Sequence, residues 1–303
     1  MMEFFQTPNI NFVDQRRIWI VFSSVLFVAS VLMTTFKGFN KNIDFTGGTE
    51  IQYRFNTQVT EGQLRSALES AGIAAEVTTL KSANAANPDW QLKIQGEPEG
   101  VKEKVQSTIR AAFPAAGDSI LAAHTIGARV GKELKWGAIW STIWVAILLI
   151  IYVTVRFEFI YSIGAIIATL HDVFVVLLVF SVFGLEFNLA VLAAILTLVG
   201  YSINDTIVVY DRIREQVKKQ RGVPYKHVVN DAINQTLSRT ILTGTTTIAS
   251  VIILIIFGGA TLQTMAIALL VGLLTGTYSS IFIAAPIIIE WHEKRTAKLA
   301  LSK

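Results

Sequence analysis

Long apolar runs separated by short polar connections make up most of the chain, and one longer polar stretch follows the first run. A helix needs about 20 mostly apolar residues to cross the roughly 30 Å hydrocarbon core of a bilayer. Six runs come near that length or exceed it, at residues 18–36, 137–155, 159–183, 188–210, 241–257 and 264–289. The fifth is the shortest and is expected to begin earlier, near Gln235. This pattern predicts an α-helical polytopic membrane protein with six transmembrane helices.

The polar stretch between the first two runs has the pattern of a folded domain. Residues 50–55 alternate between apolar and polar, as in a half-buried strand. Thr60 and Gln63 stand at the spacing of a capping box, which marks the start of a helix. The expected strands are 50–55, 75–80, 90–95 and 119–126, and the expected helices are 60–71 and 98–113. This βαββαβ order predicts an inserted α+β domain of the ferredoxin-like type.

The composition is typical of a chain that lies largely in lipid. Hydrophobic residues make up 52% of the sequence and charged residues 16%, whereas soluble domains carry about 25% charged residues. The first apolar run is too long for a signal peptide and is followed by no small-residue cleavage site, so we expect it to remain as an anchor. The chain has no cysteine, which excludes disulfides and cysteine metal sites.

Lysine and arginine residues gather on one side of the predicted membrane topology. The connection 211–240 carries seven of them and the tail 291–303 carries four, whereas the connections 184–186 and 258–263 carry none. Basic residues favour the cytoplasmic side, while domains longer than about 60 residues cross regardless of charge. The predicted organisation is a cytoplasmic segment 1–17, transmembrane helix 18–36, a periplasmic domain 37–136, a five-helix remainder 137–290 with a cytoplasmic basic loop at about 211–240, and a cytoplasmic tail 291–303.

Ionisable side chains inside the predicted spans are the main candidates for function, because placing one in the bilayer costs about 2.5–3.5 kcal/mol even on insertion scales. Asp205 lies in the cytoplasmic part of the fourth span. Arg239 precedes the fifth span, and Thr243, Thr246 and Ser250 follow it on one helical face that is expected to meet neighbouring helices. Asp205 and Arg239 form either a static ion pair or a site whose carboxylate takes up and releases a proton. The sequence leaves both interpretations open.

Three further polar residues lie inside the spans. His171 and Asp172 are adjacent near the middle of the third span, and Asn204 precedes Asp205 in the fourth. Neighbouring residues point about 100° apart on a helix, so only one of His171 and Asp172 faces a given partner. They either fix helix contacts through an internal hydrogen bond or support ion passage. Asn204 and the threonines of the fifth span are expected to support the same site.

Two glycine patterns are expected to shape the backbone. The motif D-F-T-G-G-T at 44–49 follows the first span, and its Asp44, Gly47 and Gly48 suit a turn or hinge before the first strand. It lacks the strand–loop–helix context and the G-K-[ST] signature of a phosphate-binding loop. Gly272 and Gly276 on the sixth span have the G-x-x-x-G spacing that favours close packing of helices.

These motifs together resemble a known family. They are D-F-T-G-G-T at 44–49, H-D-V at 171–173, G-Y-S-I-N-D-T-I-V-V-Y-D-R-I-R-E at 200–215 and Q-T-L-S-R-T at 235–240. In this order they resemble SecF, the smaller subunit of the SecDF protein-translocation complex in the resistance-nodulation-division superfamily. The resemblance covers nearly the whole chain, although residues 77–117 carry no motif of that family.

The resemblance implies a function that the residues alone do not give. SecF pairs with SecD in a twelve-helix membrane body, works with the SecYEG channel, and uses the proton gradient to help preproteins leave the membrane on its periplasmic side. YajC and membrane lipid are further expected partners, and no nucleic acid is expected. The family ties an aspartate of the fourth span and an arginine of the fifth to proton passage, which correspond to Asp205 and Arg239 here. No cofactor is expected beyond the ion gradient, for which sodium is an alternative to the proton.

Three other functions compete with this one. A small-molecule efflux subunit of the same superfamily would usually carry two halves and two large outer domains in one chain. A purely structural membrane subunit would use Asp205 and Arg239 only to hold helices together. An intramembrane enzyme is disfavoured, because no H-E-x-x-H or Ser–His spacing occurs and the four histidines are scattered. The sequence therefore predicts no enzymatic activity.

Overall fold

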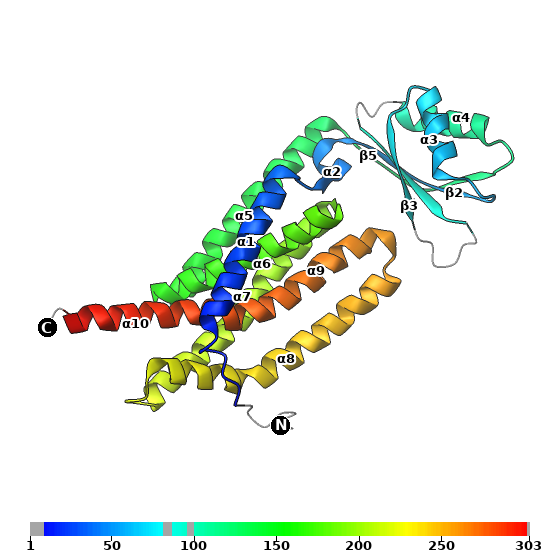
Figure 1. The fold of residues 1–303 in the computed structure, drawn as a ribbon. Helices are drawn as coiled ribbons and strands as arrows, with labels where there is room; N and C mark the ends of the chain where they lie inside the picture. The colour runs from blue at the N-terminus through cyan, green and yellow to red at the C-terminus, as the bar shows by residue number, and fades with distance from the viewer. Residues whose placement is uncertain (1–8, 81–86, 96–99, 302–303) are drawn as a thin grey trace.

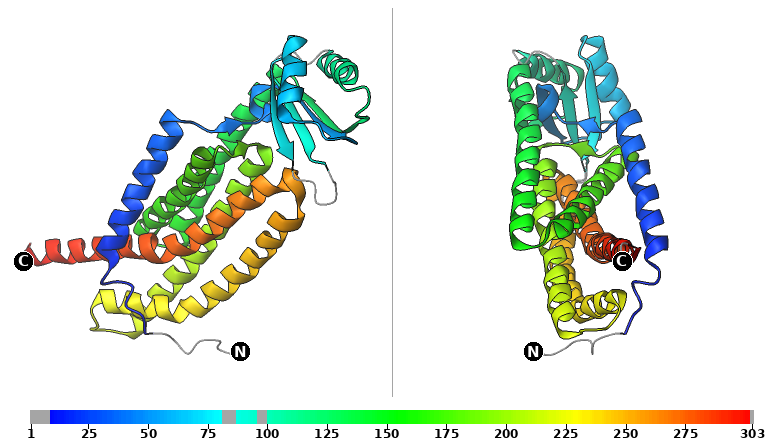
Figure 2. Two further views of the ribbon diagram at one scale, coloured as in Figure 1. Left: turned by 45° about the vertical axis from the view of Figure 1, so that its right-hand side comes forward. Right: turned by 90° about the vertical axis from the view of Figure 1, so that its left-hand side faces the viewer.

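The computed structural model describes residues 9–80, 87–95 and 100–301. A bundle of long helices, which we call the membrane body, carries a smaller domain at one end (Figure 1). We call this end the domain end and the opposite one the far end. The first helix starts at the far end and the last helix finishes there, so the domain is an insertion into the bundle (Figures 1 and 2).

Six helical stretches in the described part of the chain are long and apolar enough to cross a membrane. They are α1 (Arg16–Phe36), α5 (Ala128–Arg156), α6 (Phe159–Phe183), α7 (Leu189–Lys219), α8 (Tyr225–Phe257) and a sixth stretch made of α9 (Gly259–Ser279), the π-helical turn η1 (Ser280–Ala284) and α10 (Ala285–Leu301). The predicted fold class, six transmembrane helices with one inserted α+β domain, is confirmed.

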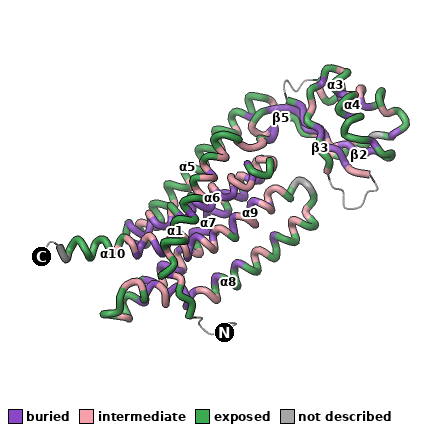
Figure 3. The backbone as a smooth tube through the Cα atoms, in the orientation of Figure 1, coloured by how far each residue is buried: buried purple, intermediate pink, exposed green. Residues whose placement is uncertain are grey.

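The centre of the membrane body is formed by α6, α7 and the sixth stretch. In their most apolar windows 44–50% of residues are buried, against 6–17% in α1, α5 and α8. Figure 3 shows the same division, with exposed residues along α5 and α8 and buried ones along α6 and α7. The outer helices therefore present apolar side chains such as Val155 and Phe257 to their surroundings, as helices in lipid do.

The inserted domain is a four-stranded antiparallel sheet with two helices on one face. In spatial order the strands are β3 (Ala75–Leu80), β4 (Asp89–Ile94), β2 (Gly48–Phe55) and β5 (Asp118–Ile126), and the helices are α3 (Glu61–Ser70) and α4 (Val101–Ala112). This is the ferredoxin-like order. The helices lie on the side of the sheet away from the membrane body (Figures 1 and 2). Between sheet and helices lies an apolar core that includes Ile51, Leu64, Leu92 and Ile109.

Local sequence signals account for much of this domain. Thr60 and Gln63 form the expected capping box, in which the Thr60 backbone N–H donates to Gln63 Oε1 at 3.0 Å and the Gln63 N–H donates to Thr60 Oγ1 at 3.4 Å. Strand β3 has the predicted bounds. The helix predicted at 98–113 is described from Val101 onward, and residues 96–99 lie outside the described part of the chain.

The predicted basic loop at 211–240 is wrong, because most of this segment is helical. Helix α7 continues to Lys219 and α8 begins at Tyr225, with a short turn between them. The two helix ends bind each other, since Gln216 Nε2 donates to Gln235 Oε1 at 2.7 Å. Polar composition suggested a loop, but a helix that leaves the bilayer keeps its backbone hydrogen bonds wherever a neighbouring helix covers one of its faces.

Two other helices extend beyond their predicted boundaries for the same reason. Helix α5 begins at Ala128, although the second span was predicted from residue 137, and α10 continues to Leu301, although the tail was predicted from residue 291. The apolar run marks the part of a helix that suits lipid, whereas the helix itself extends into the polar residues on either side. As a result, α5 joins strand β5 directly to the membrane body.

Candidate functional site

Asp205 lies where three membrane helices meet. It is half-buried on α7. Thr240 Oγ1 of α8 donates a hydrogen bond to its Oδ1 at 2.7 Å, and Ser280 Oγ of η1 donates to its Oδ2 at 2.9 Å. Each carboxylate oxygen therefore holds a different helix. A change of charge at Asp205 acts on both contacts at once.

Arg239 does not take the position beside Asp205 that a static ion pair needs. Thr240, the next residue of α8, is the one that points inward and binds the carboxylate. Arg239 is exposed, and the described part of the chain contains no ion pair between it and Asp205. Adjacent helical residues point about 100° apart, so the sequence alone could not say which of the two faces α7.

The polar stripe of α8 faces outward. Arg239, Thr243, Thr246 and Ser250 are all exposed. The three hydroxyl groups donate hydrogen bonds to backbone carbonyls of α8 itself. For example, Thr243 Oγ1 donates to the Arg239 carbonyl at 2.9 Å, and Ser250 Oγ donates to the Thr246 carbonyl at 3.1 Å. Asn204, next to Asp205 on α7, is also exposed. The predicted supporting residues Asn204, Thr243 and Thr246 therefore lie on the surface of this chain, not in its centre.

A second carboxylate, Asp172 of α6, lies fully buried in the membrane body. Its Oδ1 lies 3.3 Å from Nδ1 of His171, and its Oδ2 accepts hydrogen bonds from Ser202 Oγ of α7 and Ser279 Oγ of α9, each at 2.7 Å. The internal pair of His171 and Asp172 that the sequence suggested is thus present. Among the described residues, no group of three or more His, Asp or Glu side chains has the arrangement of a metal site.

The close approach of α7 and α9 lets two serines reach the same carboxylate. A Cβ atom on Gly272 would lie 2.2 Å from Leu198 Cδ2, and one on Gly276 would lie 3.1 Å from Ser202 Cβ. These glycines therefore serve helix packing, as their spacing predicted. Without that packing, Ser202 and Ser279 would be too far apart to share one oxygen.

The sixth span changes its hydrogen bonding at this cluster. The π-helical turn η1 begins at Ser280, and Pro286 follows shortly after it. A proline has no backbone N–H and clashes with the carbonyl one turn earlier, and a wider turn relieves both problems. Tyr210 Oη of α7 donates to the Ala284 carbonyl at 3.3 Å. π-helical turns are frequent at functional sites, and this one supplies a hydrogen-bond donor, Ser280, to Asp205.

The sequence interpretation did not assign a role in binding the carboxylates to four hydroxyl residues of the cluster: Ser202, Thr240, Ser279 and Ser280. Serine and threonine are common in transmembrane helices, where they often bind their own backbone. Composition therefore gave no reason to select these four. The only available signal was the pair of adjacent serines after the G-x-x-x-G pattern.

Asp44 ties the start of the inserted domain to the start of α7. It lies in the short helix α2 (Ile43–Thr46), after strand β1 (Asn40–Lys41), which pairs in parallel with β6 (Glu186–Phe187). Asp44 Oδ2 accepts a hydrogen bond from the backbone N–H of Leu189 at 2.9 Å. A carboxylate is favourable at a helix N-terminus, where backbone N–H groups are unpaired. The D-F-T-G-G-T motif therefore contacts the same helix that carries the half-buried carboxylate of Asp205.

The two glycines of the same motif allow backbone to touch backbone. Gly47 and Gly48 have φ angles of 74° and 144°, which favour glycine. A Cβ atom on Gly47 would lie 2.8 Å from Ala128 Cα at the start of α5, and one on Gly131 would lie 2.9 Å from the Gly47 nitrogen. The predicted hinge is thus a tight contact between α2 and α5.

Charged residues fasten the polar face of the sheet to the membrane body. Lys93 of β4 forms an ion pair with Glu186 of β6 at 2.5 Å, and Asn42 Nδ2 also donates to Glu186 Oε1. Nearby, Gln91 Nε2 donates to Glu50 Oε1 at 2.6 Å. Burial raises the pKa of Glu186, and the hydrogen bond from Lys93 opposes that rise. Glu186 therefore links the domain to the membrane body through a contact that depends on its charge.

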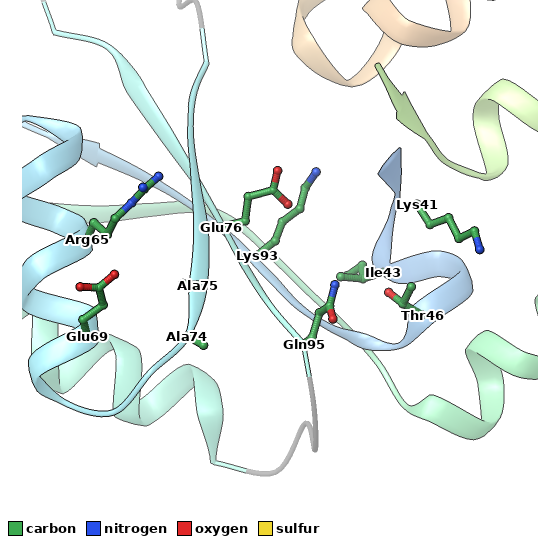
Figure 4. A pocket seen from close by; sticks show the side chains of 10 residues that line it. All are labelled: Lys41, Ile43, Thr46, Arg65, Glu69, Ala74, Ala75, Glu76, Lys93 and Gln95. Atoms are coloured by element: carbon green, nitrogen blue, oxygen red, sulfur yellow. The ribbon is translucent and has the colours of Figure 1, made fainter. Parts of the chain in front are cut away.

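Two cavities flank this contact. One of about 300 Å³ lies between the sheet and the domain end of the body, and its lining includes Glu50, His124, Glu186 and Thr264. The other, of about 480 Å³, lies beside strand β3, where Figure 4 shows Glu76 and Lys93 on the sheet and Lys41 on the opposite side. The domain thus touches the body around Glu186 and Gly47 and leaves space on either side.

Comparison with known proteins decides the family. A family model described as "Protein export membrane protein SecD/SecF, C-terminal" matches residues 105–294, and one described as "SecD/SecF GG Motif" matches residues 33–59. The "Protein translocase subunit SecF" of Rhodothermus marinus is 38% identical over 308 residues, which cover 99% of each chain. The chain belongs to the SecF family. The first model spans Asp172, Asp205 and Arg239, and the second spans Asp44 and Gly47.

The SecF family also occurs as part of longer chains. The "Protein translocase subunit SecDF" of Thermus thermophilus is 37% identical over 97% of this chain, which matches 40% of that protein. A crystal structure of Thermus thermophilus SecDF, described as a translocon-associated membrane protein, matches 97% of this chain and 40% of its own with a TM-score of 0.86 at 34% identity. A second solved SecDF structure, in a "Super-membrane-facing form", has a TM-score of 0.74 at 36% identity.

Proposed function

We propose that this chain is an accessory subunit of the Sec protein-export machinery in the bacterial inner membrane. With SecD it uses the proton motive force to promote late steps of preprotein translocation. The observation that carries this proposal is the position of Asp205, half-buried in the body and bound to two other helices, next to an outward polar stripe on α8. The role is transport, without a catalytic step of its own.

The outward stripe on α8 supports a second membrane subunit as the partner. An arginine and three hydroxyl residues are exposed along it, and charged side chains are costly when they face lipid. Another set of helices that covers the stripe removes this cost and places polar groups near Arg239. SecD is the partner that fits, because the relatives named SecDF join both subunit names in one chain. The facing carboxylate for Arg239 would then come from SecD.

The proposed orientation follows the basic residues. The ends of α7 and α8 that meet at the far end carry most of the lysines and arginines between residues 211 and 240, and basic residues favour the cytoplasm. Both termini then lie in the cytoplasm and the inserted domain in the periplasm. There the domain is placed to act near a preprotein that leaves the SecYEG channel, with YajC as a further candidate partner.

A change of charge at Asp205 gives the proposed mechanism. When ionised, the carboxylate accepts hydrogen bonds from both Thr240 and Ser280. Protonation weakens it as an acceptor, so that α8 and the sixth span are free to shift against α7. One charge that crosses 100 mV provides about 2.3 kcal/mol, which is comparable to the few kcal/mol that separate two conformers. The shift reaches the domain through α7, whose first backbone N–H binds Asp44.

The test replaces Asp205 with asparagine in the full complex with SecD. Asp205→Asn is expected to keep assembly and to abolish gradient-driven secretion into inner-membrane vesicles. Asp211→Asn is the matched control, because Asp211 lies on the same helix but forms an exposed ion pair with Arg156 at 3.0 Å. Full secretion by Asp205→Asn would overturn the role of Asp205.

The same vesicles separate the competing functions. Secretion driven by a sodium gradient alone would identify sodium as the coupling ion. Loss of assembly in Asp205→Asn, without any proton flux in the wild-type complex, would support a structural subunit. A change in drug susceptibility after deletion, with normal secretion, would support an efflux subunit.

A further inference from the structure

Two consecutive serines of the sixth span bind two different carboxylates. Ser279 Oγ donates to Asp172 Oδ2 at 2.7 Å, and Ser280 Oγ donates to Asp205 Oδ2 at 2.9 Å. Ser202, one turn before Asp205 on α7, also donates to Asp172 Oδ2 at 2.7 Å. Asp172 is therefore held by Ser202 of α7 and by the last residue of α9, and Asp205 of α7 is held by the first residue of η1. Because Ser202 and Asp205 share α7 and the two serines of the sixth span are adjacent, a movement at one carboxylate acts on the other.

We propose that Asp172 and His171 form a second proton-binding site of the membrane body, coupled to Asp205 through Ser279 and Ser280. This inference rests on the proposed ion-driven function and adds a site to it. A structural pair would need only the bonds that fix Asp172 in place. An unpaired ring nitrogen of His171 indicates that the pair also binds a proton.

His171 keeps one ring nitrogen without a partner. The residue is 3% exposed, and its Nδ1 faces Asp172 Oδ1. Nδ1 therefore carries the hydrogen of the neutral ring, and Nε2 is left as a basic acceptor. Nε2 is buried and has no hydrogen-bond partner among the described residues. Buried polar atoms are almost always paired, and an acceptor that waits for a proton explains this exception.

A groove leads from the far end of the body to this histidine. It has a volume of about 610 Å³ and lies between α1, α6 and the sixth span. His171 lines it about halfway along α6, while Glu290 and Lys294 of α10 line it near the far end. Ser23 and Ser24 of α1 add hydroxyl groups to the lining. The rest of the lining is apolar and includes Ile167, Leu170 and Ile283. In the proposed orientation the ionisable residues Glu290 and Lys294 lie on the cytoplasmic side of the groove, from which protons reach His171 in this proposal.

One proton is taken up in two steps. A proton that reaches Nε2 converts the ring to imidazolium, and the hydrogen on Nδ1 then moves to Asp172 Oδ1. The result is a neutral Asp172 and a neutral ring with its hydrogen on Nε2, so the pair has gained one proton and lost its negative charge. Neutral Asp172 is a weaker acceptor for Ser202 and Ser279. Release of the proton reverses these steps.

Few other charged or titratable groups face the pair. Tyr278 of α9 has its ring centre 6.2 Å from that of His171, and Asp205 of α7 is linked to it through the serines. On the α10 side, Glu290 pairs with Arg16 at 3.0 Å, and Lys294 lines the groove. The part of α1 that lines the groove, residues 20–28, contains no ionisable side chain.

The first test replaces the ring with a group that binds but does not titrate. His171→Asn places an amide N–H near the position of Nδ1, so Asp172 keeps a donor while proton uptake is lost. In vesicles with the full SecD-containing complex, gradient-driven secretion is expected to fall about a hundredfold, the size typical of losing a proton-transfer group, and its pH profile to flatten. His227→Asn is the control, because His227 is exposed on α8. Wild-type secretion and an unchanged pH profile in His171→Asn would overturn the second site.

The second test does not depend on how well a variant folds. Infrared difference spectra of the wild-type complex during a pH titration are expected to show two buried carboxylic acids, one lost in Asp205→Asn and the other in Asp172→Asn. Ser279→Ala is expected to change the midpoint of the Asp205 signal. A single carboxylic acid, assigned to Asp205, would overturn this inference and leave the proposed function intact. If neither acid titrates, the proposed function fails as well.

Discussion

The inserted domain and the membrane body both bury apolar side chains, but they differ in how polar groups and outer surfaces are used. The core of the domain is apolar, with Ile51 and Leu92 paired across neighbouring strands and both fully buried. The body has an apolar core as well, which includes Phe180 and Leu198. It also buries the polar cluster around Asp172, while large apolar residues are exposed along its outer helices. Water drives apolar groups inward in the domain, but lipid gives no such drive, and helices in lipid associate through close packing and hydrogen bonds. The domain should therefore depend mainly on buried apolar volume, whereas the body should depend more on small residues and on hydrogen bonds between helices.

The largest expected effect comes from removing apolar volume in the domain. Leu92→Ala leaves a cavity in the apolar core between the sheet and its two helices and is expected to lower the free energy of unfolding of the domain by about 2–5 kcal/mol. The same truncation at Leu148, 61% exposed on α5, is expected to change stability by about 0.5 kcal/mol or less. Thermal unfolding of the purified full chain, monitored by limited proteolysis, measures the stability of both variants. Equal losses in the two variants would break the comparison.

A somewhat smaller difference between matched variants is expected where the two regions touch. Gly47→Ala brings a Cβ atom within 2.8 Å of Ala128 Cα and also requires alanine at a positive φ. Gly72→Ala is the matched control, because Gly72 has a φ of 69° but no atom within 4 Å of a new Cβ. The control carries the conformational cost alone, about 1–2 kcal/mol, and Gly47→Ala is expected to lose about 1–3 kcal/mol more through overpacking. If thermal unfolding shows equal losses, the contact between α2 and α5 is looser than described.

The sequence correctly predicted elements that follow a single hydrophobic period or a local capping signal. It did not predict which side chains meet where helices contact each other. The alternating residues 50–55 and the capping box at Thr60 needed no knowledge of the rest of the chain, and six apolar runs were enough to count the spans. Thr240, not Arg239, binds Asp205 because of the way α8 is rotated against α7. That rotation is set by contacts between spans, which a periodic pattern does not contain. The helical ends of α7 and α8 escaped prediction because their polar residues look the same in a loop.

The stability of the contact between the domain and the membrane body should depend on pH through Glu186, independently of Asp172 and Asp205. Burial raises the pKa of Glu186 from its ordinary 4.5, so the folded junction binds a proton that the unfolded chain has already released. Its stabilising contribution is therefore greatest below pH 4.5 and is lost as the pH rises through the raised pKa. Glu186→Gln keeps one acceptor oxygen and does not titrate, and is expected to remove this dependence.

Domain docking is followed by hydrogen exchange at β6 and β4 across that pH range. The wild-type chain is expected to lose a small amount of protection as the pH rises, and Glu186→Gln to keep a constant value. The matched control is Glu133→Gln, because Glu133 is exposed and pairs with Arg129 of its own helix at 3.2 Å. Protection in wild type that increases with pH would mean that the ion pair with Lys93 outweighs the cost of burial.

The smallest effect on the chain alone is expected on the outward face of α8. Thr246 is exposed and its hydroxyl binds the Leu242 carbonyl at 3.0 Å. Thr142 of α5 is a close match, exposed and bound to the Ala138 carbonyl at 2.9 Å. Valine at either position is expected to change the stability of the isolated chain by about 0.5 kcal/mol or less. Only Thr246→Val should weaken co-purification with SecD, because only α8 carries the polar stripe. Equal behaviour of the two variants in that assay would mean that SecD covers another face, and the outward threonines would then be ordinary residues of a helix in lipid.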